Sequence, residues 1–168
     1  MTTVIAVKTR NGIIFGSDSQ VTAGLRKATL AEGKFFSNGA LTVGSAGAVS
    51  VIQKFQHGDV PQPEGEDAAQ YVARTLIPYL QNLEAGLGAE GYSSFLVAVG
   101  GRLFEVHPQE CYLETTGAQA IGSGANYALG YLRSINGNIT ERDVTAALKA
   151  AAAVDAGTSG PFHVRTVK

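Results

Sequence analysis

The residues with the clearest chemical potential stand at the start of the chain, in Met1-Thr2-Thr3. Methionine aminopeptidase removes an initial Met when the next residue is small, as Thr2 is. Thr2 would then carry a hydroxyl and a free α-amine, which together form a nucleophile with its own base, suited to acyl transfer. An α-amine has a reference pKa of about 7.7–8.0, close to the pH at which a general base works best. We therefore expect removal of Met1 and a nucleophilic role for Thr2.

An acidic and a basic residue follow that could tune this amine. Asp18 lies just after an expected strand, among Gly, Ser and Gln, and Lys34 directly precedes Phe35 and Phe36. A partly buried lysine needs a negative partner to stay charged, and its charge disfavours the ammonium form of a neighbouring amine. The ordinary alternatives are a turn or cap role for Asp18 and a solvated surface position for Lys34. The two adjacent Phe residues argue against a solvated lysine.

The composition is that of one soluble domain, spanning residues 1–168. The chain has 168 residues, of which 45% are hydrophobic, and this is enough for a full core. Thirteen Lys and Arg against 14 Asp and Glu give a net charge of −1, with no basic surplus for nucleic acid. No apolar stretch has the length of a membrane span, and the first residues lack the layout of a signal peptide. We expect a cytoplasmic protein with no nucleic-acid or membrane partner.

Neither a metal nor a cofactor is expected. His57, His107 and His163 are scattered, with no metal-ligand spacing. The single Cys111 excludes an intrachain disulfide and a cysteine-based zinc cluster, and its place on an expected strand predicts that it is buried. The glycine-rich stretches do not contain the Gly-x-x-x-x-Gly-Lys-Ser/Thr pattern of a phosphate-binding loop.

Apolar runs bounded by turn residues predict strands in two groups, one before and one after a helical region. Asn11-Gly12, Ser37-Asn38-Gly39 and Gly100-Gly101 are hairpin signals between consecutive runs. The expected strands are 3–7, 13–15, 34–36, 40–43, 94–99, 102–106, 111–114 and 162–167.

Helical spacing of apolar residues predicts helices over 49–55, 68–83, 127–135 and a segment that begins at Thr140. Pro78 lies inside the second pattern and should kink or shorten that helix. Thr140-Glu141-Arg142-Asp143 resembles a capping box with Asp in the acidic position. Two helix groups, each following antiparallel strands, favour an α+β fold of two packed sheets with helices on the outer faces.

The motifs in order resemble the proteasome β-type threonine peptidases, and among them the bacterial HslV-like subunits. The matching pieces are Thr-Thr at the start, residues 16–24, Lys34, the Gly-Ser-Ala-Gly of 44–47, the Gly-Ser-Gly-Ala-Asn-Tyr-Ala of 122–128, and an acid followed by Thr-Ser-Gly within 155–160. Each piece alone is weak, but together they cover nearly the whole chain. The resemblance implies the four-layer αββα sandwich of N-terminal-nucleophile hydrolases, assembly into rings, and peptide-bond hydrolysis inside a closed chamber.

The resemblance also implies roles for individual residues. Asp18 and Lys34 would form a pair beside Thr2, and the backbone N–H of Gly47 would stabilise the oxyanion, where glycine permits close approach. Ser123 would donate or accept a hydrogen bond near Thr2, although a serine before Gly124 is equally an N-cap candidate.

A supporting acid and hydroxyl are implied near the end of the chain. Asp155 matches the acid, and either Thr158 or Ser159 matches the hydroxyl, because this chain has one residue more than is usual between acid and serine. Without the resemblance, Asp155 would be a helix cap. An acid that the family carries shortly after Gly47 is replaced here by Ser50, so no role follows for it.

Five residues match positions that contact the substrate. Thr22 and Gly24 match the segment whose backbone pairs with an extended peptide, a strand-addition mode of binding. Val21, Glu32 and Ser45 match the surroundings of the first specificity pocket. Glu32 would favour basic side chains if it points inward.

The sequence therefore predicts a threonine endopeptidase in a homo-oligomeric ring or double ring, acting on polypeptides, with a possible AAA+ ATPase unfoldase as partner. Two alternatives share the same residues. The chain could be a catalytically silent ring subunit, although intact Thr2, Asp18 and Lys34 argue against that. It could also be an N-terminal-nucleophile amidase for small amides, although such enzymes usually carry larger inserts around the pocket.

Overall fold

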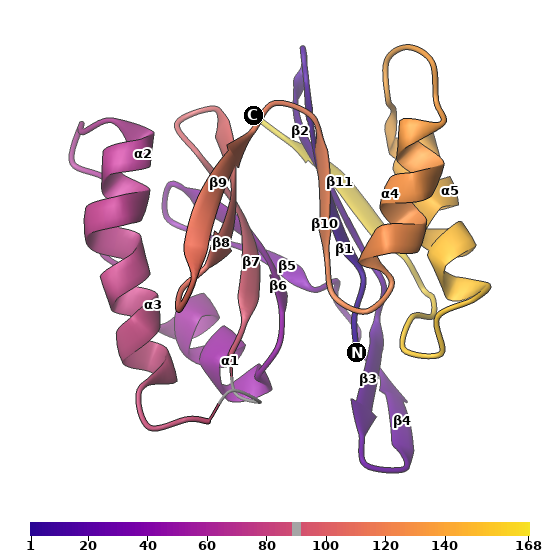
Figure 1. The fold of residues 1–168 in the computed structure, drawn as a ribbon, viewed down its shortest axis with the longest axis horizontal. Coiled ribbons are helices and arrows are strands. Elements are labelled where there is room, and N and C mark those ends of the chain that lie inside the picture. Colours follow the sequence, from indigo (N-terminus) through magenta and orange to yellow (C-terminus); the bar gives the residue numbers. More distant parts are fainter. Residues whose placement is uncertain (89–91) are drawn as a thin grey trace.

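A computed structural model describes residues 1–88 and 92–168. In these ranges the chain forms two antiparallel sheets that pack face to face, with helices on both outer faces (Figure 1). The expected α+β, four-layer αββα sandwich is confirmed. Within the described residues, no helix is both long and apolar enough to cross a membrane.

The first sheet has the strand order β10-β1-β2-β11. Its strands are β1 (Val4–Thr9), β2 (Gly12–Ser17), β10 (Ala118–Ile121) and β11 (His163–Val167). The first hairpin is confirmed, with Thr9 paired to Gly12 across a two-residue turn. Helices α4 (Ala125–Arg133) and α5 (Glu141–Ala152) cover the outer face, where Leu132, Val144 and Leu148 are buried against Ile5 and Ile14.

The second sheet has the strand order β5-β6-β7-β8-β9. Its strands are β5 (Phe35–Asn38), β6 (Leu41–Ala46), β7 (Ser94–Val99), β8 (Arg102–His107) and β9 (Cys111–Thr115). Gly100 and Gly101, with φ of 57° and 71°, form the turn between β7 and β8, as expected. Cys111 was expected to be buried, and this is wrong, because β9 is an edge strand and the thiol is exposed.

The outer face of the second sheet is covered by α1 (Val49–His57), α2 (Ala68–Tyr71), the wider turn η1 (Val72–Leu76) and α3 (Ile77–Glu84). Pro78 has no N–H to donate, and the preceding residue Ile77 donates to the carbonyl of Val72, five residues back. The helical region predicted over 68–83 is therefore confirmed, and the disturbance expected from Pro78 takes the form of a π-type turn.

Residues from both sheets meet in an apolar layer between them. Phe15, Leu96 and Leu103 are fully buried there, with Val4 and Ala6 beside them. The segment between β2 and β5, residues 18–34, contributes a hairpin, β3 (Gln20–Ala23) and β4 (Arg26–Thr29), which projects from one end of the sandwich (Figure 1). Figure 1 places the N-terminus at this same end and the C-terminus at the opposite end.

Helix α5 begins as the sequence predicts. Asp143 accepts from the N–H and the hydroxyl of Thr140, and the capping box is confirmed. This cap fixes the start of the helix that leads to Asp155, so it helps to set the position of the loop that follows α5.

Candidate active site

The first hairpin brings Asp18 against the start of the chain. Val4 pairs with Ser17, so the residues just outside the ladder, Thr3 and Asp18, lie side by side. The N–H of Thr3 donates to Asp18 Oδ1 at 2.9 Å, and the N–H of Asp18 donates to the carbonyl of Thr3 at 3.1 Å. Gln20 N–H donates to the other carboxyl oxygen at 2.9 Å. The Asp18 side chain is thus fully buried and hydrogen-bonded on both oxygens.

Lys34 reaches this carboxylate from the second sheet. Its backbone N–H donates to the hydroxyl of Ser17 at 2.8 Å, which ties the residue before β5 to the end of β2. Its Nζ lies 2.7 Å from Asp18 Oδ1 and 3.1 Å from Thr2 Oγ1, and the side chain is only 8% exposed. Burial lowers the pKa of Lys34 below its ordinary value, and the Asp18 carboxylate opposes part of this shift.

Two hydroxyls and a carboxylate complete the polar surroundings of Thr2. The backbone nitrogen of Thr2 donates to Ser123 Oγ at 3.3 Å, and Ser123 Oγ donates to Asp155 Oδ2 at 2.8 Å. Thr158 donates to the same Asp155 oxygen and shares a 2.6 Å hydrogen bond with the hydroxyl of Thr3. Burial works to raise the pKa of Asp155, but the hydrogen bonds from Thr158, Ser123 and Gly157 outweigh it and lower that pKa.

This geometry distinguishes between the alternatives that the sequence left open. Gly124, and not Ser123, is the N-cap residue of α4, so the N-cap interpretation of Ser123 is wrong. Of Thr158 and Ser159, Thr158 is the residue whose hydroxyl contacts Asp155. Ser159 takes part through its backbone carbonyl, which accepts the N–H of Ser19 at 3.1 Å.

Two glycines make room for the residues that begin the chain. A Cβ on Gly122, whose φ is +93°, would lie 2.1 Å from the carbonyl oxygen of Thr2. A Cβ on Gly124 would lie 2.0 Å from the hydroxyl of Thr3. Contacts this short do not occur in real proteins, so the Gly-Ser-Gly of 122–124 is needed for Thr2 and Thr3 to lie where they do.

A cavity of about 290 Å³ opens beside Thr2 and Lys34. Gly47, which links β6 to α1 with φ of +131°, lies in its wall. Of the residues expected to contact substrate, three line the cavity, namely Val21, Thr22 and Ser45. Gly24 lies instead at the turn of the β3–β4 hairpin, and Glu32 lines a separate surface hollow next to β11.

Sequence reasoning missed several residues of this cavity. Apolar side chains form much of its wall, contributed by Leu30, Phe36, Val49 and Ile52. Gln20 is 3% exposed and lines it too, and its side-chain amide donates to the Thr22 hydroxyl at 3.1 Å and to the Ala156 carbonyl at 2.9 Å. The position of Gln20 two residues after Asp18 was the one available signal.

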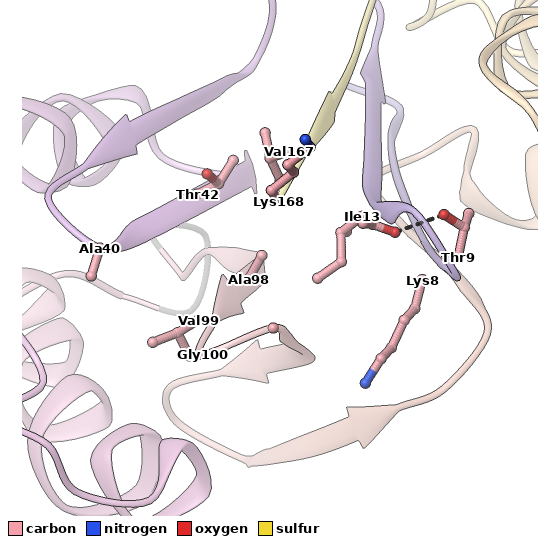
Figure 2. A pocket seen from close by; sticks show the side chains of 12 residues that line it. Lys8, Thr9, Ile13, Ala40, Thr42, Ala98, Val99, Gly100, Val167 and Lys168 are labelled. Carbon is pink, nitrogen blue, oxygen red and sulfur yellow. Dashed lines mark hydrogen bonds between the residues drawn. The ribbon is translucent and has the colours of Figure 1, made fainter.

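A second cavity lies at the other end of the sandwich, between the ends of the two sheets (Figure 2). It is lined by Lys8, Ile13, Ala40 and Val99, among other residues, and in its wall the Thr9 hydroxyl donates to the Gly12 carbonyl at 2.8 Å. Its described lining includes no carboxylate side chain and no histidine or cysteine.

No protein-family model matches the chain. Among curated proteins, the ATP-dependent protease subunit HslV of Treponema denticola is 29% identical to it over 157 residues, which cover 85% of this chain and 83% of that protein.

Solved structures share the fold. BPH of Thiobacillus denitrificans, solved in complex with epoxomicin, matches with a TM-score of 0.76 at 21% identity over 99% of this chain and 98% of that one. The eukaryotic HslV of Trypanosoma brucei matches with a TM-score of 0.67 at 19% identity over 97% of each chain. Anbu, the ancestral β-subunit, from Yersinia bercovieri matches with a TM-score of 0.72 at 20% identity over 98% of this chain and 81% of that one. The relationship in sequence to an HslV subunit, together with the shared fold, confirms the resemblance of this chain to the proteasome β-type, HslV-like family of N-terminal-nucleophile hydrolases.

Proposed function

We propose that this protein is a threonine endopeptidase that uses Thr2 as its nucleophile after removal of Met1. The observation that carries the proposal is the position of Lys34 Nζ, 3.1 Å from Thr2 Oγ1 and 2.7 Å from a fully buried Asp18 carboxylate. A nearly buried cation beside a terminal hydroxyl serves no evident packing purpose, but it would tune a nucleophile and its base.

The proposed reaction begins at the Thr2 hydroxyl. Once Met1 is gone, the Thr2 nitrogen, which contacts Ser123, is a primary amine. This amine accepts the hydroxyl proton, either directly or through one water molecule, while Oγ1 attacks the scissile carbonyl carbon. The charge of Lys34 disfavours the ammonium form of the amine, so the base is neutral near pH 7.

The intermediate would be stabilised from the opposite wall of the cavity. Gly47 offers a backbone N–H, and an oxyanion beside it would gain from a donor that is already fixed in place. Collapse of the intermediate expels the amine of the leaving peptide, which takes the proton held by the Thr2 amine. Water then attacks the ester on Thr2 and releases the second product. Ser123 and Asp155 would orient the amine throughout.

The substrate would lie along β3 as an added strand, with backbone hydrogen bonds at Thr22 and a side chain in the cavity beside Val21 and Ser45. Gly24 at the hairpin turn would lie at the outer limit of this strand. The Glu32 carboxylate lines a different hollow, so it gives no reason to expect a preference for basic side chains.

We extend the proposal to a homo-oligomeric ring or double ring in the cytoplasm, with an AAA+ ATPase as a possible partner. The HslV relative is named as a subunit of an ATP-dependent protease, and an Anbu complex of Pseudomonas aeruginosa is described as a helical assembly. Helix α4 presents Tyr127 and Tyr131, which are 51% and 39% exposed in a single chain, as apolar surface for such contacts.

The test of the nucleophile combines mass spectrometry with substitution. Thr2→Ala should abolish peptide cleavage and labelling by an electrophile that requires both the hydroxyl and the amine of an N-terminal threonine, whereas Thr2→Ser should retain part of both. Thr9→Ala, at the far end of β1, is the matched control and should cleave like the wild type. An active protein that still carries Met1, or cleavage by Thr2→Ala, would contradict the mechanism. Labelling without peptide cleavage would favour the small-amide amidase, and neither labelling nor cleavage would favour the silent subunit.

A further inference from the structure

Glu84 is a buried carboxyl group outside the cluster around Thr2. It ends α3, is 2% exposed, and forms no ion pair with a described residue. Its Oε1 accepts the backbone N–H of Ser93 at 2.7 Å, and its Oε2 accepts the side-chain amide of Gln109 at 3.1 Å. Burying a carboxyl group is costly unless its oxygens are hydrogen-bonded, so these two bonds determine how Glu84 can be accommodated.

The residue that Glu84 holds is itself in contact with the wall of the active-site cavity. Ser93 is 5% exposed, and its hydroxyl accepts the N–H of Ala48 at 3.2 Å. Gly47 packs directly on Ser93, since a Cβ on Gly47 would lie 2.6 Å from Ser93 Cα and 2.7 Å from Ser93 Oγ. Ser93 thus contacts both residues of the Gly47–Ala48 peptide, which joins the end of β6 to the start of α1.

We infer that Glu84 is a positioning residue for the oxyanion donor. Through Ser93, which accepts from the Ala48 N–H and packs against Gly47, it holds the backbone on the C-terminal side of Gly47 and so restricts the directions that the Gly47 N–H can take. Gln109, from the turn between β8 and β9, restrains the second carboxyl oxygen and so keeps the first one aimed at Ser93. The inference rests on the proposed function, because it assigns Glu84 to the transition state of that reaction.

This role predicts which kinetic constant changes. An oxyanion donor acts on the transition state, so a displaced donor lowers kcat and leaves KM nearly unchanged. Removing a whole oxyanion donor lowers kcat by about 10²–10³-fold, and a donor that is only displaced should cost less, about tenfold. The pH dependence should stay as in the wild type, since Thr2, Asp18 and Lys34 are untouched.

The test compares four variants. Glu84→Ala removes both hydrogen bonds of the carboxyl group, and Ser93→Ala removes the bond from the Ala48 N–H. The double variant should lose no more activity than the more impaired of the two single variants, because both act through Ser93. Glu84→Gln should retain most of the activity, because its Oε1 still accepts from Ser93 and its amide can donate to Gln109 after the Gln109 amide rotates. Rescue by this variant separates positioning from a need for negative charge.

A control variant accounts for loss of stability. Gln62→Ala removes a similar bond, from the Ala40 N–H to Gln62 Oε1 at 2.8 Å, at the other end of β6. It should leave kcat unchanged. All values of kcat are taken per Thr2 that an electrophile labels at completion, so that unfolded chains do not count.

A second readout does not need turnover. Amide hydrogen exchange of the segment containing Gly47 and Ala48 should be faster in Glu84→Ala than in Glu84→Gln or Gln62→Ala. Unchanged exchange there, or an unchanged kcat in both alanine variants, would overturn the inference even if the protein cleaves peptides. Faster exchange in a protein without Thr2-dependent cleavage would support the relay and refute the proposed function instead.

Discussion

The two walls of the proposed active-site cavity are held in different ways. On the wall of Thr2, the proposed nucleophile, a buried ion pair joins Lys34 to Asp18, and hydrogen bonds from four separate segments converge on Thr2 and Thr3. On the opposite wall, Gly47 is held by packing on Ser93 and by a relay of neutral donors that ends at Glu84.

The difference matches what each wall would do in the proposed reaction. Proton transfer requires pKa values tuned by nearby charges, and such charges are stable inside a protein only when they are paired and hydrogen-bonded. Stabilising an oxyanion requires only an N–H in a fixed direction, which packing and neutral hydrogen bonds can supply. Changes on the first wall should therefore alter the pH dependence of the reaction, whereas changes on the second should alter its rate at every pH.

Asp18→Asn tests the first wall and should have the largest effect in this comparison. Asp18 opposes the lowering of the Lys34 pKa by burial, so its loss lowers that pKa further. Because Lys34 must stay charged, activity falls as pH rises through its pKa, and the alkaline limb of the kcat/KM profile should move to lower pH. Near pH 7 we expect a loss of about 10²–10⁴-fold, the usual contribution of acid–base groups.

The control for this variant is Asp59→Asn, which neutralises an exposed carboxylate. This variant should change neither the rate of cleavage nor the alkaline limb of the kcat/KM profile. An Asp18→Asn enzyme with the wild-type alkaline limb would show that the Lys34 charge does not govern the reaction, and the contrast between the two walls would then be lost.

Gly124→Ala tests how tightly the nucleophile wall is packed. The new Cβ would lie 2.0 Å from the Thr3 hydroxyl and 2.9 Å from that of Thr158, so both must move. Overpacking of this kind costs about 1–3 kcal/mol of the free energy of unfolding. Gly130→Ala, inside the helix α4 that Gly124 caps, meets no atom within 4 Å and should raise that free energy by about 0.5–1 kcal/mol.

Urea denaturation of both variants provides the measurement. Equal midpoints for Gly124→Ala and Gly130→Ala would mean that the start of β1 can shift at no cost. The tight packing inferred around Thr3 would then be wrong.

The nucleophile wall was largely predictable from sequence. The hairpin over Asn11-Gly12 has a fixed register, and that register alone sets Asp18 beside Thr3. The buried position of Lys34 was predicted from the family resemblance and from its apolar neighbours. What sequence could not decide was the choice between Thr158 and Ser159, since a single residue of loop length determines which hydroxyl faces Asp155.

The opposite wall and the hairpin were less accessible to sequence reasoning. A glutamate at the end of a helix is usually solvated, and the burial of Glu84 follows from its contacts with Ser93 and Gln109, which the sequence of α3 does not reveal. Strands β3 and β4 are short. The Arg-Lys-Ala-Thr of β4 is exposed throughout, so its sequence lacks the alternation of apolar and polar residues that predicts a strand. The direction of Glu32 depends on this hairpin and so could not be inferred. Strand β10 is short and half alanine, which gives a weak strand signal.

Asp155→Asn should have the smallest effect, and it separates stability from chemistry on the nucleophile wall. The folded-state pKa of Asp155 lies below its ordinary value of 3.8, so the ionised form stabilises the fold fully above that value. This contribution is lost as pH falls through the lowered pKa, and the variant should therefore differ in unfolding free energy from the wild type at pH 6 but not at strongly acid pH.

Asp143→Asn in the capping box of α5 is the matched comparison. The pKa of Asp143 is also lowered, chiefly by its hydrogen bonds with Thr140. This variant should therefore also have a lower unfolding free energy than the wild type at pH 6 and the same one at strongly acid pH. Only Asp155→Asn should also slow peptide cleavage, because Asp155 orients Ser123 beside the Thr2 nitrogen whereas Asp143 contacts none of these groups. Equal cleavage rates for the two variants at pH 7 would reduce Asp155 to a structural carboxylate and leave the Lys34–Asp18 pair as the sole charged control of the nucleophile wall.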